Sequence, residues 1–197
     1  MHRRPLIELL RRYRDLWPAE RDQADRFLTF VSAHADCLHR HHAPGHVTAS
    51  AWILAPDDGA ALLLHHRKLG RWLQLGGHVD GEALVARAAL REAREESGMA
   101  SFGFVAWAGD EVLPIDLDVH AIPARGREPA HEHWDVRFLL RAAPGQALVL
   151  SGEGNDLRWF TAAELRTATD EDSVLRLHEK GLSLRGRPGF TRVLQID

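Results

Sequence analysis

The stretch GGHVDGEALVARAALREAREESG, residues 76–98, brings three glutamates together near its end: Glu92, Glu95 and Glu96. On a helix that turns about 100° per residue, Glu96 lies about 40° and Glu95 about 60° from Glu92, so all three project within an arc of about 100°. Like charges on one face, at the C-terminal end of a helix, oppose its formation. The pattern therefore predicts a bound cation, with an ordinary solvated charged face as the alternative.

The same residues predict the helix itself, over residues 83–97. Apolar residues recur at i, i+3, i+4 and i+7, and three of the four are alanine, which predicts close packing against a sheet. Gly98 lies where a helix often ends in a left-handed residue. The apolar positions are Ala86, Ala89, Leu90 and Ala93.

Three carboxylates on one face offer hard oxygen ligands, which favour Mg²⁺ or Mn²⁺ over a softer metal. Mg²⁺ keeps several waters, and substrate phosphates usually complete its coordination. A carboxylate site of this kind therefore suggests the hydrolysis of a phosphate compound.

Residues 77–99 resemble the signature box of the Nudix hydrolases, G-x5-E-x7-R-E-U-x-E-E-x-G-U, in which U is a bulky apolar residue. The isolated glutamate of the box falls on Ala83, and Glu82 stands one residue early, where its charge favours the helix N-terminus. The preceding RWLQLGG resembles the family's W-x-L-P-G-G, with Leu75 in the proline's place. The matching positions are Gly77, Arg91, Glu92, Glu95, Glu96, Gly98 and Met99, with Ala93 as a small residue at U.

This resemblance implies an α/β/α sandwich with a mixed sheet. It also implies Mg²⁺-dependent hydrolysis of a nucleoside diphosphate linked to another moiety, by attack of water on phosphorus, with Mn²⁺ as a second candidate. Glu92, Glu95 and Glu96 would bind the metal together with the carbonyl of Gly76. Arg91 would orient the carboxylates through Glu95. The alternative function is a Nudix-like ligand-binding or regulatory module without catalysis.

Several residues outside the helix are candidates for contact with the substrate or for a general base. His78 directly follows the glycine pair, and Trp72 lies shortly before it. The segment AHEHWDVRF contributes further candidates, although an exposed polar turn before a strand is the alternative for this segment. The predicted substrate contacts are His78, Trp72, Glu132 and His133, and the candidate general bases are Glu111, His131, Glu132 and His133.

The chain divides into a helical N-terminal extension, residues 1–45, and a Nudix-type domain, residues 46–197, that includes two C-terminal helices. The helical spacing of apolar residues in the extension predicts two amphipathic helices, which could pack on the domain, form a homodimer or cover the substrate. Thr161 and either Asp172 or Ser173 are the predicted N-caps of the C-terminal helices. Strands are predicted over residues 47–55, 61–67, 102–107, 112–122, 134–142 and 155–160.

The segment DCLHRHHAPGH, residues 36–46, predicts a polar connection between the two parts. Four histidines in it, His39, His41, His42 and His46, suggest zinc. Structural zinc sites usually carry cysteines at set spacings, and only Cys37 is near, so the connection is the preferred interpretation.

Composition narrows the kind of partner. The 197 residues carry a formal net charge of −3, which provides no basic field for nucleic acid and no polybasic membrane surface. A single cysteine excludes an internal disulfide framework and suits a reducing compartment. We therefore expect a soluble cytoplasmic protein whose partner is a small phosphorylated metabolite.

Overall fold

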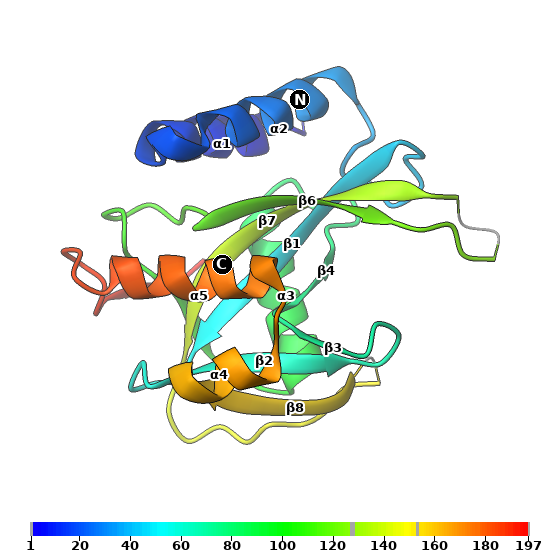
Figure 1. Cartoon of the computed structure of the whole chain (residues 1–197). Coiled ribbons are helices and arrows are strands. Elements are labelled where there is room, and N and C mark those ends of the chain that lie inside the picture. Colours follow the sequence, from blue (N-terminus) through cyan, green and yellow to red (C-terminus); the bar gives the residue numbers. More distant parts are fainter. Residues whose placement is uncertain (1, 127–128, 153, 197) are drawn as a thin grey trace.

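A mixed β-sheet forms the middle layer of the computed structural model, which describes residues 2–126, 129–152 and 154–196 (Figure 1). Helix α3 (Val85–Ser97) packs on one face of this sheet, and α4 (Ala162–Ala168) and α5 (Asp172–Leu184) pack on the other. The predicted α/β/α sandwich is thus confirmed.

The sheet is built around a long parallel pair, β1 and β7, and its main path runs β3-β2-β1-β7-β5-β9. Strand β4 pairs with β1, β6 with β7 and β8 with β2, and all pairs except β1–β7 are antiparallel. The strands are β1 (Gly45–Leu54), β2 (Ala60–His66), β3 (Arg71–Leu73), β4 (Leu75–His78), β5 (Phe102–Val105), β6 (Asp116–Ile122), β7 (His131–Ala142), β8 (Gly154–Thr161) and β9 (Val193–Leu194).

Alternation along β1 and β7 divides the core into two layers, because successive side chains of a strand point to opposite faces. Val47 is opposite Trp134, and both belong to the apolar cluster that includes α3. Trp52 is opposite Leu139, and both belong to the cluster that includes α5. Towards the beginning of both strands the α5 face carries polar residues instead, and the histidines described below lie there.

The N-terminal extension forms helices α1 (Arg4–Leu16) and α2 (Arg21–Ala33), joined by a 3₁₀ turn. The two helices lie side by side above β6 and β7 in Figure 1. Phe27 and Phe30 of α2 both contact the ring of Trp134. The extension therefore shares the core of the α3 face and covers the edge strand β6.

The C-terminal helices begin in different ways. Thr161 caps α4 as predicted, in a capping box with Glu164. The prediction for α5 is wrong by one or two residues, because Glu171 occupies the N-cap position and its side chain makes no capping hydrogen bond.

The polar connection also ends earlier than predicted. Strand β1 begins at Gly45, so His46 is a strand residue with only 1% of its surface exposed. His39 and His41 stay in the connection, where their rings stack on each other. Among the described residues, no helix is long and apolar enough to cross a membrane.

Candidate functional site

Helix α3 carries the glutamates as predicted, but it starts two residues later than expected. The backbone N–H of Leu84, just before the helix, donates a hydrogen bond to Glu82 Oε1 at 2.9 Å. Glu82 therefore stabilises the turn that leads into the helix. At the other end Gly98 adopts the left-handed conformation, with φ 71°, and Met99 is buried.

Glu96 points from α3 into the protein and is only 4% exposed. Its Oε2 accepts a hydrogen bond of 2.8 Å from the backbone N–H of Gly76 in β4. A β-carbon on Gly76 would meet Ser50 of β1 at 2.3 Å, so this close strand pairing requires glycine. The carboxylate of Glu96 is thus fixed against the first glycine of the pair.

Glu92 approaches the second glycine of the pair. A β-carbon on Gly77 would lie 2.6 Å from the carboxyl carbon of Glu92 and 2.7 and 2.8 Å from its two oxygens. The carboxylate of Glu92 therefore occupies the space that the missing side chain leaves. Glu92 and Glu96 converge on the dipeptide Gly76–Gly77 from the same helix.

Arg91 holds this arrangement from the solvent side. Its guanidinium donates to Glu92 Oε1 at 2.8 Å, to Glu95 Oε2 at 3.1 Å and to the backbone carbonyl of His78 at 2.7 Å. Burial alone would lower the pKa of Arg91, but Glu92 and Glu95 raise it above its ordinary value. Arg91 thus ties two glutamates of the helix to strand β4.

The three glutamates have different surroundings. The side chain of Glu92 is 13% exposed, whereas that of Glu95 is 58% exposed. The fold brings Glu92 and Glu96 to the glycine pair and leaves Glu95 at the surface beside Arg91.

Other predicted residues lie in separate surroundings. Trp72 packs edge-on against Phe160, with the guanidinium of Arg158 5.0 Å from the centre of its ring, and it lines a cleft of about 280 Å³ beside the end of α4. Glu111, a candidate general base, pairs with Arg12 of α1 at 3.0 Å. Glu132 lies opposite Gly45 at the start of the β1–β7 pair.

His78, His131 and His133 do come together, and two further histidines join them: His46, which the sequence grouped with the histidines of the connection, and His120, which no sequence pattern singled out. His46 of β1 and His120 of β6 are both opposite His133 in the sheet. The ring centre of His133 lies 4.8 Å from that of His46, 5.3 Å from that of His78 and 5.4 Å from that of His120. We call these five residues the histidine cluster.

Two members of the histidine cluster, His46 and His133, have pKa values well below the ordinary value of a histidine. Burial first, and then the neighbouring imidazoles, lower the pKa of His46 to about 4 and that of His133 to about 2. Both ring nitrogens of His46 are buried and have no hydrogen-bond partner among the described residues. An unsatisfied buried polar group of this kind costs about 1–3 kcal/mol.

A buried ionic network continues along the same face of the sheet. Arg137 of β7, 1% exposed, donates to Asp116 at 3.2 Å and to Asp118 at 3.0 Å. Arg176 and Lys180 of α5 also bind Asp116, at 2.9 and 2.8 Å. These ion pairs connect α5 to β6 and β7. The sequence did not predict them, because single charged residues within strand patterns do not indicate which residues they pair with.

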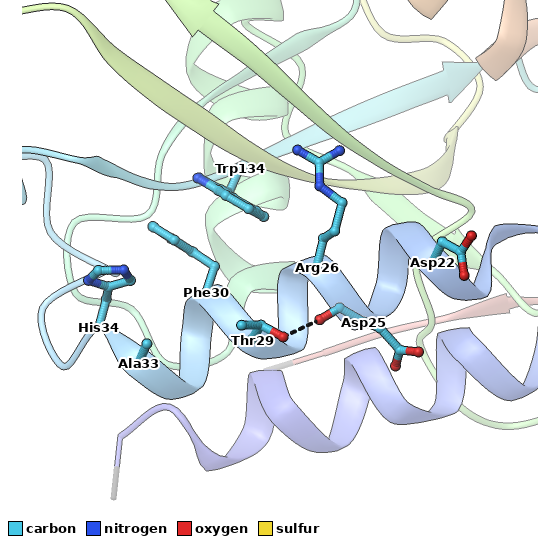
Figure 2. Close-up of a pocket in the computed structure, with 8 residues that line it drawn as sticks. All are labelled: Asp22, Asp25, Arg26, Thr29, Phe30, Ala33, His34 and Trp134. Atoms are coloured by element: carbon cyan, nitrogen blue, oxygen red, sulfur yellow. Dashed lines mark hydrogen bonds between the residues drawn. The ribbon is translucent and has the colours of Figure 1, made fainter.

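A shallow depression of about 550 Å³ lies beside α2, and none of the residues from 76 to 98 lines it. Figure 2 shows the ring of Phe30 parallel to that of Trp134 in this depression, with Arg26 close by. The two ring centres are 4.1 Å apart and the planes differ by 4°. The face of Trp134 is therefore occupied by Phe30.

Comparison with known proteins gives a family match. The model of the NUDIX domain matches residues 44–178. A NUDIX-family hydrolase from Clostridium perfringens is 24% identical, with a TM-score of 0.55 over 71% of this chain and 97% of that chain. An Ap4A hydrolase from C. elegans, in a binary complex, is 18% identical, with a TM-score of 0.55 over 70% of this chain and 95% of that chain.

A MutT NUDIX hydrolase from Burkholderia pseudomallei is 24% identical, with a TM-score of 0.51 over 68% of this chain and 95% of that chain. At these identities the likeness to solved structures concerns the fold. A comparison with curated proteins gives no match. The family match begins at residue 44, one residue before β1, so helices α1 and α2 lie outside it.

Proposed function

Because the chain belongs to the Nudix family and is therefore a hydrolase of phosphorus-containing anhydrides, we propose that it hydrolyses a pyrophosphate bond, with Mg²⁺ as its metal. The substrate would be a nucleoside diphosphate linked to another moiety. The observation that carries this proposal is the convergence of Glu92 and Glu96 on the glycine pair. The two carboxylates, together with the carbonyl of Gly76 that the resemblance adds, would form a donor set of hard oxygens, which suits Mg²⁺ or Mn²⁺.

Glu92, Glu96 and the carbonyl of Gly76 would hold the metal, and Glu95 would assist from the surface. When bound, a divalent ion would neutralise the negative charge of the pyrophosphate oxygens and lower the pKa of a water molecule. Arg91 acts as a positioning residue, because it contacts Glu92 and Glu95 and fixes both to the carbonyl of His78.

The substrate class rests on the family and on charge. With a net charge of −3 the chain has no basic field for a polynucleotide, and a small phosphorylated metabolite can be held by the metal instead. Similar solved structures are described as an Ap4A hydrolase and as a dihydroneopterin triphosphate pyrophosphohydrolase, and these descriptions concern those two proteins. Substrate contact by His78, Trp72, Glu132 and His133, a cytoplasmic location and a homodimer stay predictions of the sequence.

The test is turnover of a panel of diphosphate compounds with Mg²⁺ or Mn²⁺, analysed by chromatography. The panel contains nucleotide sugars, ADP-ribose, dinucleotides, coenzyme A derivatives and nucleoside triphosphates. We expect metal-dependent hydrolysis that the substitution Glu96→Gln abolishes. Glu95→Gln, on the exposed side of the same helix, is the matched control and should retain more activity.

Binding of a panel compound without turnover, in both the wild type and Glu96→Gln, would favour the regulatory module over the enzyme. Hydrolysis that Glu96→Gln leaves unchanged would contradict the assignment of the metal ligands.

A further inference from the structure

Five histidines from four strands meet on the face of the sheet that carries α5. His131 and His133 are two residues apart in β7, so both point to this face. The register of the sheet places His46 of β1 and His120 of β6 on either side of His133. His78 of β4 approaches from the next strand, with its ring centre 4.9 Å from that of His46. Sequence separation hides this cluster, because its members come from residues 46 to 133.

We propose that His46, His131 and His133, completed by His78, bind one divalent ion of the class that prefers imidazole, such as Zn²⁺. One ring nitrogen from each of the first three residues lies within 4.8 Å of the others. His131 Nε2 and His133 Nε2 are 3.3 Å apart. Two nitrogens bound at about 2.0–2.1 Å to a tetrahedral ion would be separated by about 3.3 Å.

The environment of the nitrogens fits a metal site. His131 Nδ1 lies 2.9 Å from the carbonyl oxygen of Pro129, which can only accept a hydrogen bond. Nδ1 of a neutral His131 therefore carries the proton and Nε2 presents its lone pair to His133. Main-chain carbonyls commonly fix metal-binding histidines in this way. His46 is almost fully buried, with both ring nitrogens unpartnered among the described residues, and a bound ion would satisfy one of them.

His78 is the better fourth ligand of the two remaining histidines. The ring of His78 contacts the rings of both His46 and His133. The ring of His120, on the other side of His133, contacts only that of His133 among the described residues. Four imidazoles would complete a four-coordinate, tetrahedral sphere around the ion.

This site would differ in chemistry from the carboxylate site on α3, since imidazole suits Zn²⁺, Cu²⁺, Fe²⁺ and Ni²⁺ and carboxylate suits Mg²⁺ and Mn²⁺. The ion would join β1, β4 and β7. His78 directly follows the pair Gly76–Gly77, and its carbonyl accepts the hydrogen bond from Arg91. Binding of an ion to the histidine cluster would therefore stabilise strand β4, which carries the glycine pair.

The experiment measures Zn²⁺ binding to the full chain after removal of metal, with excess Mg²⁺ present and no substrate. Competition with a chromogenic chelator gives the affinity, and elemental analysis gives the stoichiometry. We expect one tightly bound ion per chain. His131→Asn and His133→Asn should each weaken binding by about 100-fold or more, beyond the loss typical of outer partners of a metal site. His41→Asn, at an exposed histidine of the connection, is the matched control and should bind Zn²⁺ as the wild type does.

Absence of a bound ion in the wild type, or unchanged binding in both β7 variants, would overturn the proposal. Weakened binding in His41→Asn alone would instead place the ion in the connection. Thermal melting of the metal-free variants checks their folding. If they do not fold, Co²⁺ in the wild type decides, because a visible spectrum typical of tetrahedral nitrogen coordination is expected and an octahedral spectrum contradicts the site. Glu96→Gln should keep its Zn²⁺, so this result stands or falls independently of the hydrolase assignment.

Discussion

Gly77 and Glu92 lie so close that a β-carbon on Gly77 would stand 2.6 Å from the carboxyl carbon of Glu92. Gly77→Ala should therefore push the carboxylate of Glu92 out of place. We expect kcat/KM to fall by about 100-fold, because a displacement of about 1 Å at a catalytic group costs roughly that much. Steady-state kinetics at several Mg²⁺ concentrations measures the effect.

Gly152→Ala is the matched control for Gly77→Ala, since a β-carbon on Gly152 would meet open space. We expect it to keep wild-type activity. Full activity of Gly77→Ala would show that the position of Glu92 does not matter for turnover.

Arg91→Lys tests the positioning role of the guanidinium. Arg91 donates to three acceptors at once, and the single ammonium of a lysine lacks the planar fork that reaches them. We expect a higher Mg²⁺ concentration for half-maximal activity, with little change in thermal stability. Arg87→Lys, on the exposed side of α3, should leave the Mg²⁺ dependence unchanged. An equal shift in both variants would contradict the positioning role of Arg91.

Asp116→Asn tests the buried ionic network. Asp116 is fully buried and binds Arg137, Arg176 and Lys180, so its neutralisation removes the buried carboxylate that these three cations share. We expect the free energy of unfolding to fall by about 3–5 kcal/mol, as measured by urea denaturation. Asp110→Asn removes a surface pair with Arg192 and should cause no measurable change. Equal stability of the two variants would contradict the importance of the network.

Phe30→Ala tests how firmly the N-terminal helices are attached. The ring of Phe30 is 7% exposed and stacks on Trp134. Its removal should lower the free energy of unfolding by about 3–5 kcal/mol. Phe30→Leu should lose less, because it keeps most of the buried apolar surface. A single unfolding transition in both variants would show that α2 unfolds together with the sheet, and two transitions would show that it does not.

His178 predicts a pH dependence of stability. Burial first, and then the nearby Arg166 and Arg185, lower the pKa of His178 below its ordinary 6.5. Below pH 6.5 the unfolded chain therefore binds a proton that the folded chain does not, and stability falls as the pH falls. We expect His178→Leu to flatten this fall between pH 7 and pH 5, measured as the difference in the free energy of unfolding. An identical slope in wild type and variant would contradict the shift.

Local patterns predicted the parts of the site that one helix can build. The spacing of Glu92, Glu95 and Glu96 and the glycine at position 98 gave the helix, its end and the face that carries the charges, because helical periodicity is fixed by the backbone. The start of the helix was misplaced by two residues. Glu82 interacts with Leu84 before the first turn, and this local hydrogen bond has no periodic signature.

Sequence alone thus determined the family of this protein, the helix with its carboxylates, the glycine pair and most of the strands. Only the tertiary structure decided that Glu96 reaches Gly76, that Glu95 stays at the surface, and that His46 lies beside His133. These relationships depend on which strands pair and in which register. Pairing is set by how the apolar faces of distant segments pack together, so it brings residues 87 positions apart, such as His46 and His133, to one point.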